Sequence, residues 1–138
     1  MDIMMSLIKA LFGRKAKILI IDDNDETASF LAMFLKSKGY RTERASNGVE
    51  GLRTAESVSP DLVFLDITMP KMDGKEVLLR MKSNPATQKV PVIMCTDHSA
   101  LDEVEECCRL GAVGYILKPF ETAKVLHTVK SMLESRGL

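Results

Sequence analysis

Short apolar runs alternate with longer amphipathic segments along most of this 138-residue chain. The run Lys17–Ile21 is aliphatic at successive positions, which predicts a strand that is covered on both faces. A helix is predicted over residues 25–38, because its apolar residues recur at helical spacing and Gly39 follows as a stop signal. The apolar positions of that helix are Phe30, Leu31, Phe34 and Leu35.

The same unit of a strand followed by a helix repeats along the chain. Further strands are predicted over residues 41–45, 62–65, 90–95 and 114–117. Further helices are predicted over residues 49–57, from the turn at residues 69–74 to residue 81, and over residues 101–110 and 122–134. Such alternation implies a parallel sheet with helices on both faces, because each right-handed crossover has to cover one face. The predicted fold class is a doubly wound α/β domain with five strands, and a flavodoxin-like strand order of 2-1-3-4-5 is compatible with this pattern.

Polar residues follow four of the predicted strands, at the edge of the sheet where ligands bind in such folds: Asp22 and Asp23, Asp66, Thr96, and Lys118. In the order 2-1-3-4-5, Asp66 lies about 4.8 Å from its neighbours on each side, and Lys118 lies about 10 Å away, within reach of a lysine. Three converging carboxylates repel one another and require shifted pKa values or a cation, and an all-oxygen ligand set favours Mg²⁺.

A divalent cation, a carboxylate, a hydroxyl and an ammonium group together supply what phosphoryl transfer to an aspartate requires. Taken singly, each residue has a structural interpretation as well. Asp66 could be a turn or cap residue, Asp22 could cap the next helix in place of Asn24 or Asp25, and Tyr115 could be a half-buried aromatic. The convergence of the strand ends favours Asp66 as the phosphoryl acceptor.

The same residues match a family. Five motifs occur in order: Asp22-Asp23, Asp66, Met69-Pro70-x-Met72-Asp73-Gly74, Thr96, and Tyr115-x-x-Lys118-Pro119-Phe120. Over residues 16–137 the chain resembles the receiver domain of two-component response regulators, and the set of motifs is far more specific than any one of them. The expected organisation is a receiver domain over residues 15–138 after an extension over residues 1–14.

The resemblance implies a phosphorylation-dependent signalling switch and not an enzyme. Asp66 would accept a phosphoryl group from a histidine kinase or phosphotransfer protein in the presence of Mg²⁺. The implied metal ligands are Asp23 and Asp66 directly, Asp22 through water, and the backbone carbonyl of Thr68.

The resemblance also implies how the switch responds. Lys118 would bind the phosphoryl group, aimed by a cis peptide bond before Pro119. Thr96 would move to a phosphoryl oxygen, and Tyr115 would turn into the space that Thr96 leaves. The downstream protein target would bind the surface made by residues 101–110, 114–117 and 122–134, where an acidic helix suggests a basic partner.

Two features depart from the family pattern. Asp97 follows Thr96 where a small residue is usual, and its charge would repel an incoming phosphoryl group, which predicts slower phosphorylation by small donors or altered partners. Residues 1–14 carry an amphipathic stripe: Ile3, Met4, Leu7, Ile8 and Leu11. This extension could dock on a partner, form a homodimer, rest on a membrane, pack on its own domain, or be a leader from an upstream start.

Charge and cysteine content narrow the function classes. The 19 basic and 19 acidic residues cancel, so the chain shows no electrostatic footprint for nucleic acid. Three cysteines without metal-ligand spacing indicate a reduced, cytoplasmic protein. Because the chain ends at Leu138 without an effector domain, the expectation is a stand-alone receiver that signals by protein–protein interaction.

Three rival functions remain. An aspartyl-phosphate phosphatase would need its two acids two positions apart, and here Asp22 and Asp23 are adjacent. A flavodoxin-like cofactor binder would need a phosphate loop after the first strand, where five residues, 22–26, are acidic or Asn. The closest alternative is a receiver-like binding module that acts without phosphorylation.

Overall fold

The computed structural model describes residues 3–4 and 15–137. Ile3 and Met4 are helical and exposed, and the rest of the predicted extension over residues 1–14 lies outside the described residues. Within the described part of the chain, no helix is long and apolar enough to cross a membrane.

Five parallel strands form one sheet in the order β2-β1-β3-β4-β5, which confirms the predicted doubly wound fold. The strands are β1 (Lys17–Ile21), β2 (Arg41–Ala45), β3 (Leu62–Asp66), β4 (Val92–Thr96) and β5 (Gly114–Leu117). The prediction placed the start of β4 two residues too early. The amide of Val90 donates to the carbonyl of Thr87 in a turn, and Pro91 has no amide to donate to a ladder.

Five α-helices and one short 3₁₀-helix complete the described elements: α2 (Asp25–Ser37), α3 (Gly48–Val58), α4 (Gly74–Lys82), η1 (His98–Ala100), α5 (Leu101–Arg109) and α6 (Thr122–Glu134). Three of the α-helices begin at a side-chain cap, since the first amides of a helix have no partner within it. Asn24 caps α2, Asn47 caps α3 and Asp73 caps α4. Because Asn24 caps α2, Asp22 is not needed for that task.

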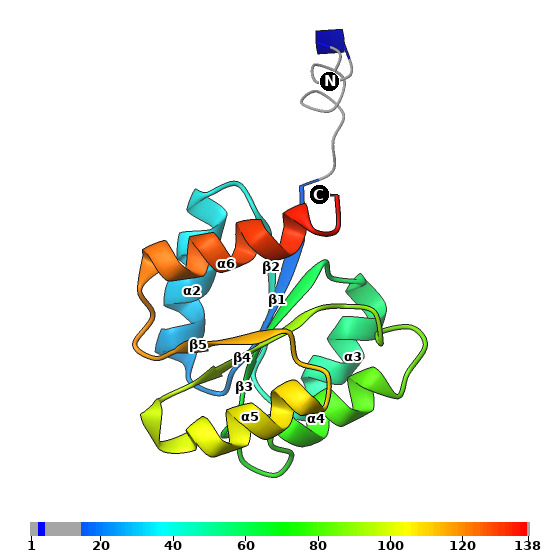
Figure 1. The fold of residues 1–138 in the computed structure, drawn as a ribbon, viewed down its shortest axis with the longest axis vertical. Helices are drawn as coiled ribbons and strands as arrows, with labels where there is room; N and C mark the ends of the chain where they lie inside the picture. Colours follow the sequence, from blue (N-terminus) through cyan, green and yellow to red (C-terminus); the bar gives the residue numbers. More distant parts are fainter. Residues whose placement is uncertain (1–2, 5–14, 138) are drawn as a thin grey trace.

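The sheet separates two hydrophobic cores. Figure 1 shows α2 and α6 on one face of the sheet and α3, α4 and α5 on the other. Successive residues of β1 point to opposite faces, so Ile18 and Ile20 join the first core while Leu19 and Ile21 join the second. This two-sided burial explains why the strand shows no polar alternation.

One residue of the predicted core stripe of α2 lies outside the core. Phe30 is 49% exposed, because the buried face of α2 is formed by Ala28, Leu31, Ala32 and Leu35. The prediction was wrong because small alanines can line a core-facing stripe as well as larger side chains, and they shift its centre around the helix. Phe30 instead faces the surface at the side of the molecule where Lys118 and Phe120 lie.

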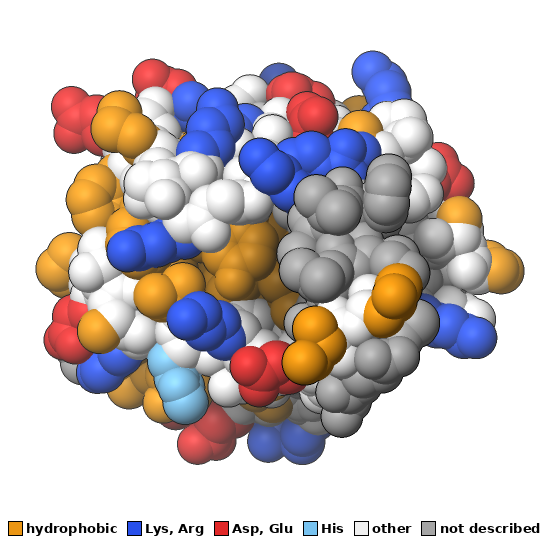
Figure 2. Space-filling view, turned by 90° about the horizontal axis from the view of Figure 1, so that it is seen from above, with side chains coloured by type: hydrophobic (Ala, Val, Ile, Leu, Met, Phe, Trp, Pro, Cys, Tyr) orange, Lys and Arg blue, Asp and Glu red, His pale blue; other side chains and the backbone are white. Residues whose placement is uncertain are grey.

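Hydrogen bonds join β1, the residue before β3 and the residues after α6 at the end of the sheet where the strands begin. Buried Asp61 accepts a hydrogen bond from the amide of Lys17 (2.8 Å), and its carbonyl accepts one from the guanidinium of Arg136 (2.9 Å). Seen from this end, Lys and Arg side chains lie above, to the left of and below an area of hydrophobic side chains (Figure 2). The candidate site lies at the opposite end of the strands.

Candidate functional site

Three carboxylates meet beyond the carboxyl ends of β1 and β3. These strands are neighbours with Ile21 paired to Leu65, so Asp22 and Asp66, the next residues, lie side by side. One oxygen each of Asp22, Asp23 and Asp66 lie within 4.8 Å of one another. Asp22 and Asp66 are buried, while Asp23 is exposed, so the cluster opens to solvent on one side.

Lys118 reaches this cluster from β5, across the intervening strand β4. Its ammonium donates to Oδ2 of Asp22 at 2.8 Å and to Oδ1 of Asp66 at 3.2 Å. The amide of Lys118 donates to the carbonyl of Thr96 at 2.7 Å, and the peptide bond to Pro119 is cis. The expectation that a lysine could span two strand spacings is therefore met by the observed contacts.

Burial and neighbouring charges together set the pKa values of Asp66 and Lys118. Desolvation raises the pKa of Asp66 to about 6, the charge of Asp22 adds to this rise, and Lys118 opposes it. Burial alone would lower the pKa of Lys118, but its hydrogen bond to Asp22 and the charge of Asp66 raise it. Lys118 therefore remains a cation, and Asp66 changes charge close to neutral pH.

The donor set suits a hard divalent cation. Three carboxylates against one ammonium group leave an excess of negative charge in a half-enclosed place, and oxygen ligands are those that Mg²⁺ prefers. Thr68 is exposed beside the cluster, and its backbone amide opposes the rise in the pKa of Asp66. The exposed side of the cluster, at Asp23 and Thr68, leaves room for water ligands.

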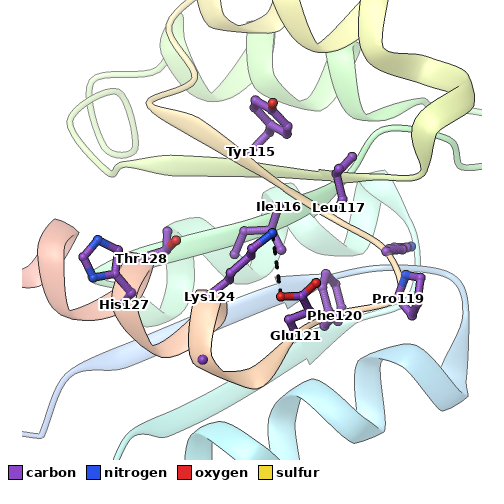
Figure 3. Close-up of a pocket in the computed structure, with 11 residues that line it drawn as sticks. Tyr115, Ile116, Leu117, Pro119, Phe120, Glu121, Lys124, His127 and Thr128 are labelled. Atoms are coloured by element: carbon purple, nitrogen blue, oxygen red, sulfur yellow. Dashed lines mark ion pairs between the residues drawn. The ribbon is translucent and has the colours of Figure 1, made fainter.

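The two residues predicted to form the switch lie on neighbouring strands. Thr96 is buried at the end of β4, and its hydroxyl donates to the carbonyl of Asp97 at 3.1 Å. Tyr115 on β5 is 49% exposed, and Figure 3 shows its ring pointing away from α6. Thr96 thus borders the cluster through the backbone of Lys118, whereas Tyr115 lies outside it.

One residue important for the geometry, Gly74, entered the sequence analysis only as part of a family motif. A Cβ atom added to Gly74 would lie 2.2 Å from the carbonyl oxygen of Asp66, so the start of α4 approaches the acceptor strand as closely as glycine allows. The Gly74 amide also donates to the carbonyl of Ile67 at 2.8 Å. The dipeptide Asp73-Gly74 signals a turn in the sequence, but it does not show this close approach.

Asp97 takes part in a local hydrogen-bonded turn. Its carboxylate accepts a bond from the amide of Ser99 at 2.8 Å and another from the Ser99 hydroxyl, and so caps η1. Sequence reasoning missed this role, because an aspartate bonds the amide two residues on only where the backbone turns in this way. The prediction that the charge of Asp97 slows phosphorylation stays a prediction.

A family comparison agrees with the fold. The family model of the response regulator receiver domain matches residues 18–130. The chain belongs to the family of response regulator receiver domains of two-component signalling.

Related proteins differ in how much of their length this chain covers. Sporulation initiation phosphotransferase F of Bacillus subtilis is 38% identical over 117 residues, which are 85% of this chain and 93% of that protein. Regulatory protein AtoC of Escherichia coli is 33% identical over 122 residues, 88% of this chain but 26% of AtoC. The DNA-binding dual master transcriptional regulator RpaA of Synechocystis is 32% identical, and the match spans 48% of its length.

Solved structures show the same fold. The chemotaxis protein CheY4 of Vibrio cholerae superimposes with a TM-score of 0.81 at 28% identity, covering 86% of this chain and 99% of that chain. A putative response regulator from Chloroflexus aurantiacus gives a TM-score of 0.83 at 30% identity, covering 88% of this chain and 99% of that chain.

Proposed function

We propose that this receiver domain is a signalling switch that accepts a phosphoryl group on Asp66 from a histidine kinase or phosphotransfer protein. The observation that carries the proposal is the contact of Lys118 with both Asp22 and Asp66, within a cluster of three carboxylates. A relative of similar length is named a phosphotransferase, which supports phosphoryl transfer as the chemistry of this site.

The residues of the site would divide the work of phosphoryl transfer. The Asp66 carboxylate is the nucleophile, and Lys118 is placed to donate hydrogen bonds to the oxygens of the group that arrives. Asp23, Asp66 and the Thr68 carbonyl would hold Mg²⁺ directly, with Asp22 acting through water. When bound, Mg²⁺ neutralises charge on the phosphoryl oxygens.

The response to phosphorylation would begin at Thr96. A phosphoryl group adds about two negative charges beside a buried hydroxyl, and that hydroxyl is bonded to the Asp97 carbonyl in this structure. Movement of Thr96 to a phosphoryl oxygen leaves space that the half-exposed ring of Tyr115 could enter. Those two contacts are the differential interactions that a population shift requires.

The output surface would be the face formed by α5, β5 and α6. A groove lies there between β5 and α6, and Figure 3 shows Tyr115 on one side and His127, Thr128 and Lys124 on the other. Leu101 in α5, Val113 just before β5 and Tyr115 in β5 expose apolar side chains, which suits a protein partner. The prediction that the chain does not bind nucleic acid rests on its balanced charge and stays a prediction.

Intact mass spectrometry after incubation with Mg²⁺ and acetyl phosphate tests the proposal. We expect the wild-type chain to gain the mass of one phosphoryl group, and EDTA to abolish the gain. Asp66→Asn removes the nucleophile and keeps the shape of the side chain, so it should gain nothing. A wild-type chain that stays unlabelled with acetyl phosphate and with histidine kinases would instead support a binding module that acts without phosphorylation.

A further inference from the structure

The connection between β4 and α5 contains a side-chain cap directly beside the residue proposed to sense the phosphoryl group. The Asp97 carboxylate accepts bonds from the amide and the hydroxyl of Ser99. The Asp97 carbonyl accepts a bond from the amide of Ala100 at 3.4 Å. Asp97 is therefore fixed by both its side chain and its backbone to the turn η1 that follows it.

The same carbonyl holds the hydroxyl of Thr96. Thr96 is buried, and its Oγ1 donates to the Asp97 carbonyl at 3.1 Å. To bond to a phosphoryl oxygen on Asp66, the Thr96 hydroxyl has to leave this acceptor. How firmly the turn fixes the Asp97 carbonyl therefore bears on how readily Thr96 is released.

We propose that Asp97 and Ser99 form a latch that holds Thr96 in the unphosphorylated arrangement and so slows the response of Asp66 to phosphoryl donors. This inference rests on the proposed function, because it assigns Asp97 as a positioning residue for the same reaction. The latch reduces the fraction of molecules in which the Thr96 hydroxyl is released from the Asp97 carbonyl. A ligand that needs the released form binds more weakly in proportion to that fraction.

The latch and simple charge repulsion make different predictions for one substitution. Asparagine caps helices as well as aspartate does, because its side-chain oxygen accepts the same amide bond, but it carries no charge. Asp97→Asn therefore keeps the latch and removes the repulsion. Asp97→Ala removes both.

Phosphorylation rates of a small set of variants separate these cases. With acetyl phosphate and Mg²⁺, Asp97→Ala should be labelled about fivefold faster than wild type, the factor that corresponds to one lost capping bond. Ser99→Ala keeps the charge and the amide bond and loses the hydroxyl bond, so a smaller increase, about twofold, is expected. Asp97→Asn should be labelled at the same rate as wild type, within the error of the measurement.

A second readout separates the latch from a general loosening of the domain. The concentration of beryllofluoride that half-saturates the Mg²⁺-loaded protein should fall about fivefold in Asp97→Ala and stay unchanged in Asp97→Asn. The Mg²⁺ affinity in the absence of beryllofluoride should be equal in all variants, since Asp97 is not among the three clustered acids. Equal rates in wild type and Asp97→Ala, or equal acceleration in Asp97→Asn and Asp97→Ala, would overturn the latch.

Hydrogen exchange of the Ser99 amide tests the latch without any phosphoryl donor. This amide should be protected in wild type and in Asp97→Asn and should exchange freely in Asp97→Ala. If wild type takes up no phosphoryl group, the proposed function fails, and this exchange measurement still decides whether the latch exists. Identical exchange in the three proteins would show that it does not.

Discussion

Asp61 directly precedes the buried strand β3 and Asp66 ends it. Asp61 is surrounded by hydrogen-bond donors, whereas Asp66 is surrounded largely by other carboxylates. Asp61, 5% exposed, uses its carboxylate to accept the Lys17 amide, its amide to reach the Lys17 carbonyl, and its carbonyl to accept Arg136. Asp66, 6% exposed, faces two further carboxylates, and burial together with Asp22 raises its pKa to about 6. Both acids are buried, but Asp61 is bonded to the backbone of a neighbouring strand.

The partners of a buried acid distinguish a structural role from a functional one. A buried carboxylate that accepts backbone amides stabilises the fold, because it satisfies donors that would otherwise lack a partner. A buried carboxylate that faces other carboxylates costs free energy unless a cation or a proton is present, and such unfavourable clusters are typical of functional sites. Binding of a cation at the Asp66 end of β3 would therefore relieve the repulsion among the carboxylates, which favours this end as the place where a cation and a phosphoryl group bind.

The largest effect on stability is expected where the functional end is packed most tightly. Gly74→Ala would place a Cβ atom 2.2 Å from the Asp66 carbonyl oxygen, so we expect the free energy of unfolding to fall by about 3 kcal/mol. Gly114→Ala is the matched control, since its added Cβ would lie 3.6 Å from Ile93, an ordinary contact. Urea unfolding of both variants measures the difference, and equal stabilities would contradict the packing described for α4.

The next effect is expected at the structural end of the strand. Asp61→Ala leaves the Lys17 amide without its side-chain acceptor, and we expect a loss of about 2 kcal/mol in the free energy of unfolding, with or without Mg²⁺. Asp61→Asn keeps an acceptor oxygen and should lose less. If the loss in Asp61→Ala depended on Mg²⁺, the division between the two ends would be wrong.

The smallest effect is the pH dependence that Asp66 contributes. Its pKa is raised to about 6 from 3.8, so the folded state binds this proton more tightly than the unfolded state. Without Mg²⁺, the resulting stability is fully present below about pH 4 and is lost as the pH rises through about 6. The loss should be about 1.5 kcal/mol, about half of what the pKa shift alone would give, because the open side of the cluster lets water screen the charges. The difference in unfolding free energy between wild type and Asp66→Asn, measured from pH 4 to 8, isolates this contribution.

Mg²⁺ provides the control for that titration. The cation competes with the proton for the same carboxylate, so saturating Mg²⁺ should remove the decline in wild type and leave Asp66→Asn almost unaffected. A difference between the two proteins that did not change with pH would show that Asp66 is ionised at an ordinary pKa.

The apolar pattern predicted the sheet well because the burial of β1, β3 and β4 on both faces leaves continuous apolar runs in the sequence. The strand order 2-1-3-4-5 does not follow from this pattern alone; it is implied by the resemblance to receiver domains, and it brings Asp22, Asp66 and Lys118 together. Sequence spacing is sufficient to predict that these side chains converge, because they lie at or directly after the ends of strands, and those ends are fixed relative to one another.

The remaining features depend on contacts that no local pattern encodes. The burial of Asp61 depends on the amide of Lys17 in another strand, and the need for glycine at position 74 depends on the path of the β3–α4 loop. The outward position of the Tyr115 ring is one of several allowed rotamers, which sequence does not select. Asp97 was interpreted by its charge alone, whereas its bonds to Ser99 emerge from the turn.

Reductive trapping of the phosphorylated chain tests the central claim most directly. Borohydride converts an aspartyl phosphate to homoserine, so peptide mass spectrometry after treatment with acetyl phosphate, Mg²⁺ and borohydride identifies the modified residue. The account predicts homoserine at position 66, none at positions 22 and 23, and none anywhere when Mg²⁺ is withheld. Homoserine at another aspartate, or the same yield at Asp66 in Lys118→Ala as in wild type, would contradict it.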